Sequence, residues 1–571
     1  LELDYAFTPW FKAIYRAGIY SIGEETRSYT RKFLATGANS ARNVPGVVTD
    51  GNNNYKRINS DLILSFKKDL GKFTNRLLLG QNLRYDNRKQ TSIGVTNSQG
   101  SGQLLYPDVI NPGSRTGNLA GSSAITNYRS ISVYGEYVAG YDQLLFLTIT
   151  GRNDWVSVLS KANRSFFYPG VSLSFVASEA IGFIKNSASI SFAKAYVSLN
   201  KTGNVTLTPY RLNNPYTQSN GFPFGNIAGF LPSSSNPNPN IHPEFVTSYE
   251  AGIQLGMFNN RLNIEGAYAF SDSKGQILNA NTSTSTGYSS AIVNAGRLVN
   301  SVIELSVNGD LIRNQNIRLN LGVNFTYVNN QLKELYAQAS EINNFRQSYG
   351  VLNEAFPSLM VSDYKRDEQG RVIVDGFGDP IVAATPTLLG TLVPPYQTGL
   401  SAVFQYKSFR IGAQFDWRAG GWLYSEIVPA MYAAGTDPRT IAYNRQPFVW
   451  PNSVVETAPG KYTENTQPTS SGGRAFWAKQ GEVQINTAAK SDFFKLRELN
   501  ISYTLPTGLL AKQNFIRDAS IALVATNLFI IRHIDNKYGD PEYLYNNTDG
   551  YLSFRQVPPF KSYGINLNLT F

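Results

Sequence analysis

Residues 367–379 form the stretch whose residue types come closest to a metal-binding site. Asp367, Glu368, Asp375 and Asp379 lie there among glycine and apolar residues, and carboxylate oxygens of this kind are typical calcium ligands. Their spacing does not match the ligand positions of an EF-hand loop. We therefore expect an ordinary Asp- and Gly-rich hairpin at these residues and no metal site.

Two pairs of acidic residues are spaced closely enough to suggest general acid and base chemistry. Asp492 lies near Glu498, and Asp540 lies near Glu542, but each pair falls on a predicted strand face or loop of the kind that any large β-protein carries. The chain has no cysteine and only two histidines, so a thiol nucleophile, a thiolate metal site and a histidine-based triad lack their residues. We expect no enzyme activity and no cofactor.

Large aromatic side chains gather in one long polar segment, residues 422–490. Rings of this size stack on sugar rings or peptide side chains in binding sites. The alternatives are packing within the loop itself or contact with a partner protein, since aromatic residues anchor both. The candidates for substrate or partner contact are Tyr432, Tyr443, Phe448, Trp450 and Trp477.

Positive charge is spread along the whole chain. The formal net charge is +11, yet no single segment combines a basic stripe with interleaved aromatic residues. We therefore predict no nucleic-acid partner. A mild excess of positive charge has a simpler use at an anionic membrane surface.

The elements that would position these residues are predicted to be β-strands. The 571 residues include 34 tyrosines, 33 phenylalanines and 48 glycines, and no apolar run reaches the roughly 20 residues of a membrane-spanning helix. Composition alone also fits a soluble all-β protein such as a propeller or a sandwich. The pattern along the strands has to decide between these classes.

That pattern alternates with a period of two, as in the strands of a transmembrane barrel. Residues 127–139 place Ile131 and Val133 on one face and Ser132 and Tyr134 on the other. Residues 246–272 repeat this design as one hairpin with an Asn-rich turn.

Short turns alternate with long polar segments along the chain. This alternation indicates an outer-membrane barrel with short periplasmic turns and long extracellular loops. The short turns lie at 72–73, 140–143, 258–261, 314–316 and 407–408. The long segments are 21–57, 86–126, 200–245, 331–395, 422–490 and 531–559. A propeller or a sandwich has no reason to place every long loop at one end.

The last strand, residues 560–571, alternates to its final residue and ends on Phe571. An ordinary soluble edge strand carries charges or bulges that prevent edge-to-edge pairing. This apolar final strand is typical of outer-membrane barrels.

Roughly 17 strands can be counted, an odd number where single-chain bacterial barrels have an even one. We therefore expect residues 1–571 to be the C-terminal part of an all-β, antiparallel transmembrane barrel of about 22 strands in the complete protein. An export signal, about five strands and an N-terminal plug domain would then be missing upstream of Leu1.

Several blocks of the sequence resemble the C-terminal barrel half of SusC/RagA-family TonB-dependent outer-membrane transporters of Bacteroidetes. Pro243 departs from the family pattern, as do Ser301 and Val302, where a glycine is common. The blocks occur in the family's order at residues 238–253, 258–262, 294–308, 492–506, 525–529 and 538–542.

The resemblance implies an active importer that a TonB box upstream couples to the TonB–ExbB–ExbD system. It also implies a SusD-like surface lipoprotein as a lid, outer-membrane lipids as surroundings, and an oligosaccharide or peptide as cargo. Two other functions stay open: a barrel scaffold for secretion or surface assembly, and a passive porin with an open lumen.

Overall fold

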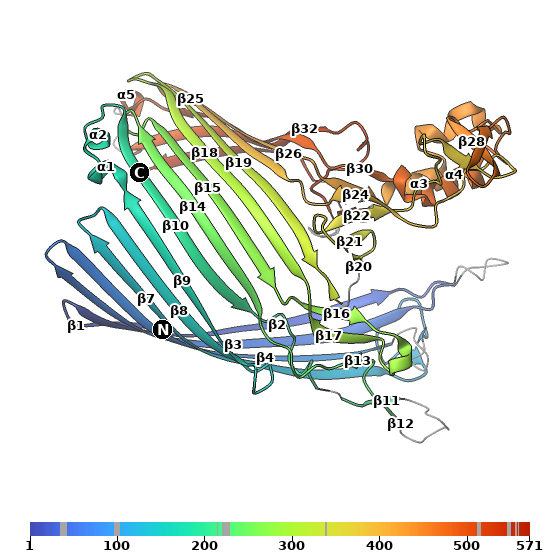
Figure 1. Ribbon diagram of the computed structural model, residues 1–571, viewed down its shortest axis with the longest axis horizontal. Helices are drawn as coiled ribbons and strands as arrows, with labels where there is room; N and C mark the ends of the chain where they lie inside the picture. The colour runs from blue at the N-terminus through green and yellow to red at the C-terminus, as the bar shows by residue number, and fades with distance from the viewer. Residues whose placement is uncertain are drawn as a thin grey trace. The chain divides into compact units, whose positions relative to one another are not determined.

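The computed structural model contains seventeen strands that, among the described residues, belong to one antiparallel sheet (Figure 1). This confirms the predicted all-β class and strand count. The structure describes the chain except residues 35–42, 96–102, 214, 220–228, 337–339, 511–514, 545–549, 554–556 and 558. The strands of this sheet are β1 (Glu2–Thr8), β2 (Phe11–Thr30), β3 (Val47–Leu70), β4 (Phe73–Val95), β7 (Ala120–Tyr141), β8 (Leu145–Val156), β9 (Ser165–Val176), β10 (Ile190–Asn204), β14 (Glu244–Met257), β15 (Leu262–Lys274), β18 (Arg297–Arg313), β19 (Ile317–Glu334), β25 (Tyr396–Tyr406), β26 (Phe409–Ala419), β31 (Phe493–Thr504), β32 (Asp518–Arg532) and β34 (Ser562–Thr570).

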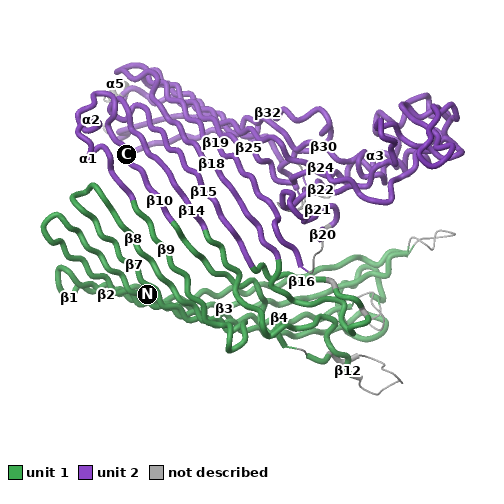
Figure 2. The backbone as a smooth tube through the Cα atoms, viewed as in Figure 1, with its two compact units in different colours: residues 1–173, 199–247, 275–295 green, residues 174–198, 248–274, 296–571 purple. Residues whose placement is uncertain are grey.

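Two compact units divide the chain (Figure 2). Unit 1 comprises residues 1–173, 199–247 and 275–295. Unit 2 comprises residues 174–198, 248–274 and 296–571.

In unit 1, β1, β2, β3, β4, β7 and β8 pair in chain order as antiparallel hairpins. The turn between β3 and β4 consists of Gly71 and Lys72, and Gly71 adopts a φ of 59°. Tight hairpin turns require such positive φ values, which glycine adopts without strain. The predicted turn at 72–73 is therefore confirmed to within one residue.

The two faces of these strands differ as the alternation predicted. On β4, the exposed side chains of Leu79 and Leu83 occupy one face. On the other face, Asn82 donates a hydrogen bond to Asp61 of β3, with 2.7 Å between Nδ2 and Oδ1. Gly80 on that face leaves room for the ring of Tyr134, because an added Cβ would lie 2.2 Å from its Cζ.

The strands of unit 1 extend far beyond a membrane span, and here the predicted loop boundaries are wrong. β3 has 24 residues and β4 has 23, against about 10 for a transmembrane strand. Polar cross-strand pairs continue the ladder, such as Arg27 of β2 with Asp50 of β3 at 2.6 Å between Nε and Oδ1. Polar residues on both faces resemble a loop in sequence, although their backbones are paired.

In unit 2, β15, β18, β19, β25, β26, β31, β32 and β34 also pair in chain order. The predicted short turns at 258–261, 314–316 and 407–408 are confirmed, since they lie between β14 and β15, between β18 and β19, and between β25 and β26. Phe258, Asn259 and Asn260 all have positive φ values in the first turn. Asparagine tolerates this region better than most residues.

The long connections contain small sheets and short helices rather than irregular chain alone. In unit 1 these are β5 (Gln103–Leu104), β6 (Arg115–Thr116), β11 (Thr217–Ser219), β12 (Gly229–Leu231), β13 (Ser235–Asn236), β16 (Ile277–Asn281), η2 (Thr284–Thr286) and β17 (Ser290–Asn294). In unit 2 they are β20 (Glu341–Phe345), β21 (Ser348–Val351), β22 (Ser358–Val361), β23 (Val372–Val374), β24 (Thr387–Thr391), β27 (Trp422–Ser425), α3 (Ile427–Ala434), η4 (Pro438–Arg445), β28 (Ser453–Ala458), β29 (Lys461–Glu464), α4 (Arg474–Glu482), η5 (Gln484–Asn486), β30 (Ala488–Lys490) and β33 (Tyr551–Leu552). Three short helices lie instead in the shorter connections of unit 2: α1 (Ala177–Ala180) and α2 (Gly182–Lys185) between β9 and β10, and α5 (Thr507–Leu510) between β31 and β32. Within the described part of the chain, no helix has the length and apolar character needed to cross a membrane.

Candidate functional site

The predicted aromatic residues lie in one compact lobe of unit 2, formed by residues 363–383 and 426–490 (Figure 1). In the lobe, β23, β28 and β29 form a small sheet, and α3 and α4 contact each other. The rings of Tyr432 on α3 and Trp477 on α4 are 5.8 Å apart between centroids. The segment predicted as a long loop is thus a folded lobe with its own core.

All of the candidate rings belong to one connected cluster. Tyr443 stacks on Phe448 with 4.2 Å between centroids, and Phe448 contacts Trp450 and Trp477. Phe476, which the sequence analysis did not single out, joins the cluster through Phe448 at 5.8 Å. Stacked and edge-on rings at such distances stabilise a core beyond their buried area.

The aromatic residues of this cluster differ in how far they are exposed to solvent. Tyr432, Phe448 and Trp477 are buried, Trp450 is half-buried, and the Tyr443 side chain is 54% exposed. The buried rings hold the lobe together. Tyr443 is the candidate ring that presents most of its surface to an incoming molecule.

A buried carboxylate joins the lobe to the connection between β32 and β34. Asp437 accepts hydrogen bonds from Arg439 Nε at 2.9 Å and from Tyr538 Oη at 3.1 Å. Burial alone would raise the pKa of the Asp437 carboxyl, but the hydrogen bonds and charge of Arg439 outweigh it and hold the pKa below its usual range. The guanidinium of Arg439 also lies 4.6 Å from the centroid of the Tyr432 ring.

This connection, described at residues 533–544 and 550–553 and here called the connecting loop, touches unit 2 at several further places. β33 pairs in parallel with β27, placing Tyr551 opposite Tyr424. Ser553 donates to Glu426 at 3.2 Å, and Arg346 lies 3.8 Å from the centroid of the Tyr551 ring. The connecting loop is therefore attached to the lobe.

A β-bulge in β31 brings two cationic side chains, Lys495 and Arg497, to the other part of the connecting loop. The register of β26 with β31 changes from Gln414↔Glu498 to Phe415↔Leu496, which leaves Arg497 as the extra residue. A bulge of this kind re-aims the side chains beyond it. Lys495 consequently shares a face with Glu498.

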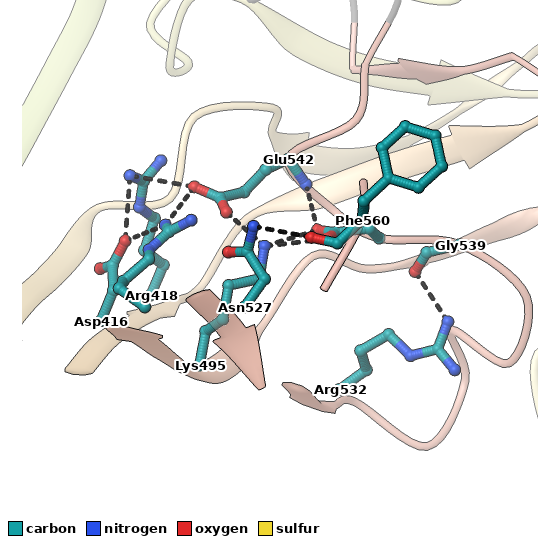
Figure 3. A network of polar contacts seen from close by, with 10 residues as sticks. Asp416, Arg418, Lys495, Asn527, Arg532, Gly539, Glu542 and Phe560 are labelled. Atoms are coloured by element: carbon teal, nitrogen blue, oxygen red, sulfur yellow. Dashed lines mark hydrogen bonds and ion pairs between the residues drawn. The ribbon is translucent and has the colours of Figure 1, made fainter. Parts of the chain in front are cut away.

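Six charged side chains meet there in an ion network, and Figure 3 labels four of them. Lys495 donates to Asp540 at 2.8 Å and to Glu542 at 2.6 Å. Arg497 binds both Asp416 and Glu542, and Arg418 lies 3.2 Å from each of these two carboxylates. Three positive and three negative side chains balance one another, which a buried charge cluster requires.

The network explains the acidic pair of the connecting loop. Asp540 and Glu542 point towards Lys495 and Arg497 of β31. They do not face each other across a gap in which a substrate could bind. Burial alone would raise the pKa of the Glu542 carboxyl, but the hydrogen bonds from Arg497 and Lys495 outweigh it and lower the pKa to about 2. Both carboxylates therefore act as anchors that fix the connecting loop to β26 and β31.

Three other acidic residues from the sequence analysis, Asp492, Asp367 and Asp379, also have structural partners. Asp492 accepts from the backbone N–H of Gly420 at 2.8 Å. Asp367 accepts from Arg371 Nε at 2.7 Å, and Asp379 accepts from the backbone N–H of Ser470 at 2.8 Å. Among the described residues, no group of three or more Asp, Glu, His or Cys side chains is placed to hold a metal ion.

Two hollows of unit 2 have polar walls. A cavity of about 360 Å³ lies between β27, the segment after α4 and the connecting loop, and Trp422, Arg439, Asn486 and Tyr538 line it. A second hollow of about 700 Å³ follows β25, β26, β31, β32 and β34, with alternate residues such as Glu498 in its wall. The first combines an aromatic ring with hydrogen-bond donors, the chemistry of a site for an oxygen-rich organic molecule.

The sequence matches the family model described as "TonB dependent receptor-like, beta-barrel" over residues 1–528. TonB-dependent receptor P26 of Formosa agariphila is 23% identical, with 86% of this chain and 50% of the relative covered. TonB-dependent receptor SusC of Bacteroides thetaiotaomicron is 25% identical over 52% of this chain and 32% of that protein. The fold is similar to that in the structure of the RagAB peptide transporter, with a TM-score of 0.77, 17% identity, and coverage of 100% of this chain and 61% of the other. The chain spans about half the length of the P26 relative.

Proposed function

Because the chain belongs to the family of TonB-dependent receptor-like β-barrels, we propose that it imports an organic nutrient across the outer membrane. It is an outer-membrane receptor of the SusC/RagA type. The observation that carries the proposal is the folded long-loop end of unit 2, where the lobe, the connecting loop and a polar cavity meet. Residues 1–571 are proposed to be the C-terminal part of the complete barrel with its long extracellular loops.

The proposed cargo is an oligosaccharide or a peptide. Both present many hydrogen-bonding oxygens beside apolar surface, and the cavity lined by Trp422 and Arg439 offers a partner for each. The RagAB neighbour is called a peptide transporter, which supports the peptide alternative by analogy of fold only.

A SusD-like lipoprotein is the proposed partner of the lobe. Phe377 and Tyr443 are 73% and 54% exposed, and Ile441 and Val449 are also exposed. Exposed apolar and aromatic side chains on a folded surface are typical of a protein interface. The predicted site residues thus divide into core rings and one proposed contact ring, Tyr443.

Energy is proposed to come from the TonB–ExbB–ExbD system through the complete protein. Binding of cargo and lid changes the conformation only if each binds one state more tightly than the other. The connecting loop could transmit such a change, because it is attached to both the lobe and the sheet.

Native mass spectrometry of the protein extracted gently from outer membranes tests this proposal. We expect a chain heavier than 63.1 kDa with a stoichiometric lipoprotein attached. Tyr443→Ala is expected to weaken lipoprotein binding by about tenfold, as for an exposed aromatic anchor. Tyr462→Ala, on β29 of the same lobe, is the matched control and should leave binding unchanged.

Uptake by the native cells gives the second measurement. Loss of import on deletion of the lipoprotein or of TonB supports the active importer. A protein without any lipoprotein that conducts ions freely in planar bilayers contradicts it and favours the passive porin.

A further inference from the structure

The outward face of β3, β4 and β7 in unit 1 carries an apolar band with a defined upper limit. On β4 the band runs from Phe73 to Leu83, both exposed. Ten strand steps of about 3.4 Å, tilted by about 40°, rise about 26 Å, which matches the roughly 25 Å apolar band of a transmembrane barrel. On β3 the last apolar residue of the band is Ile58. On β7 the polar residues Arg129 and Asn127 follow Ile131 on this face and separate the band from a single further exposed apolar residue, Ile125.

Directly above this limit, each of the three strands places a cation on the same face. Lys56 follows Ile58 on β3, and Arg129 follows Ile131 on β7, each two residues further along. On β4, Lys89 is the second outward residue after Tyr85, following Asn87. All three cations are exposed.

The pairing register brings these cations together as a patch. Lys56 is opposite Asn87, and Lys89 is opposite Asn54, so the two lysines are diagonal neighbours. Such neighbours are about 7–8 Å apart, a distance that one phosphate group can bridge. Arg129 is opposite Tyr85 on the other side of β4.

The charge of this patch is not compensated locally. Among the residues that the structure describes, Lys56, Lys89 and Arg129 form no ion pair. On the same face, Asn87 and Asn127 bond to each other at 2.8 Å. The acidic residues further along this face are Glu25 and Asp50, and Asp50 is already paired with Arg27.

Aromatic side chains mark the same level as the membrane–water interface. Tyr85 donates to Asn127 at 2.9 Å, and the guanidinium of Arg129 lies 5.4 Å from its ring centroid. Trp155 of β8 is opposite Ile131. Tyrosine and tryptophan are enriched at this depth because their rings are apolar and their tips are polar.

We propose that Lys56, Lys89 and Arg129 bind the phosphate groups of a glycolipid in the outer leaflet. The long-loop end of a bacterial barrel faces outward, and the three cations stand where the phosphates of that leaflet would lie. Because they project from paired strands rather than loops, their backbone positions are fixed before the lipid arrives. This site belongs to unit 1, whereas the residues of the proposed cargo region belong to unit 2.

Binding of purified lipid A to the detergent-solubilised protein tests the proposal. We expect Lys56→Gln/Lys89→Gln to weaken binding by about thirtyfold, from about 1 kcal/mol for each lysine near an anionic surface. The matched control is Lys67→Gln/Lys68→Gln, which removes the same charge from the exposed short-turn end of β3 and should leave binding unchanged. A gel shift on heating verifies that every variant is folded.

Two further probes separate a lipid site from a phosphate site. Dephosphorylated lipid A should bind as weakly to the wild type as lipid A binds to the Lys56→Gln/Lys89→Gln variant. If Lys56→Gln/Lys89→Gln and the control Lys67→Gln/Lys68→Gln bind lipid A equally well, the proposal is overturned. Displacement of lipid A by inorganic phosphate at similar concentration also overturns it, because free phosphate would then suffice.

Discussion

Removing Lys495 should release the connecting loop from the sheet. Lys495 is 5% exposed and holds both Asp540 and Glu542, which are 11% and 21% exposed. Breaking a buried ion pair on one side costs about 3–5 kcal/mol, because the remaining charges stay buried without their partner. Arg497 still binds Glu542 in a Lys495→Met variant, so we take the lower end, about 3 kcal/mol.

The pKa of Glu542 gives an independent measure of this magnitude. Its fall from 4.5 to about 2 corresponds to a net stabilisation of the carboxylate by about 3 kcal/mol, left after the partners' hydrogen bonds and charges outweigh burial. The loss caused by one lysine is therefore expected to be of this order.

Amide hydrogen exchange of the connecting loop measures the effect. A loss of about 3 kcal/mol in local opening free energy accelerates exchange about a hundredfold. The backbone N–H groups of Gly539 and Tyr543, which bond to Asn536 and Asp540, should show it. In Lys461→Met, an exposed lysine of the lobe, exchange in this loop should stay unchanged.

A change of no more than about twofold in Lys495→Met would refute the reasoning, because the free energies of unrelated substitutions already scatter by about 0.5 kcal/mol. Equal acceleration throughout β31 would refute it as well, because the effect would then be global unfolding. In Lys495→Met/Glu542→Gln, the loss should be smaller than the sum of the single losses, since the two residues are in contact.

Two other predictions concern acid and packing. The folded-state pKa of Glu542 lies below its ordinary value, so its contribution to stability is present above pH 4.5 and is lost as the pH falls towards about 2. The protection factors of the connecting loop, which correct each exchange rate for the intrinsic effect of pH, should fall over this interval, and less so in Glu542→Gln. Gly80→Ala should cost about 1–3 kcal/mol in urea unfolding from lipid vesicles, because the new Cβ meets the Tyr134 ring, and Gly80→Ala/Tyr134→Ala should recover part of that loss; equal stability of Gly80→Ala and wild type would contradict the packing argument.

The strands and short turns were predictable because their signals are local. Alternation over a few residues decides which face Ile131 or Ser132 occupies, and the turn at 407–408 needs only its two flanking strands. The upper parts of β3 and β4 were missed because Asn52, Asn53 and Asn54 look like a loop while their backbones are paired.

The candidate site was only partly predictable. The aromatic residues were identified, but their common core depends on the fold of α3 and α4, which the loop-like composition conceals. The ion network joins Arg497 to Asp416 and Glu542, which are 81 and 45 positions away in sequence. Only the bulge in β31 brings them together, and a bulge has no clear sequence signal.

The length of the unit 1 strands has a consequence for the resistance of the protein to proteolysis. From Ile58 to Val47, β3 continues for about 37 Å of paired backbone at about 3.4 Å per residue. Proteases cleave chain that can be drawn into their active sites as an unpaired segment, so paired strands resist them and loops of equal length are cut. The sheet can therefore extend well beyond the lipid surface without offering a cleavage site along its length.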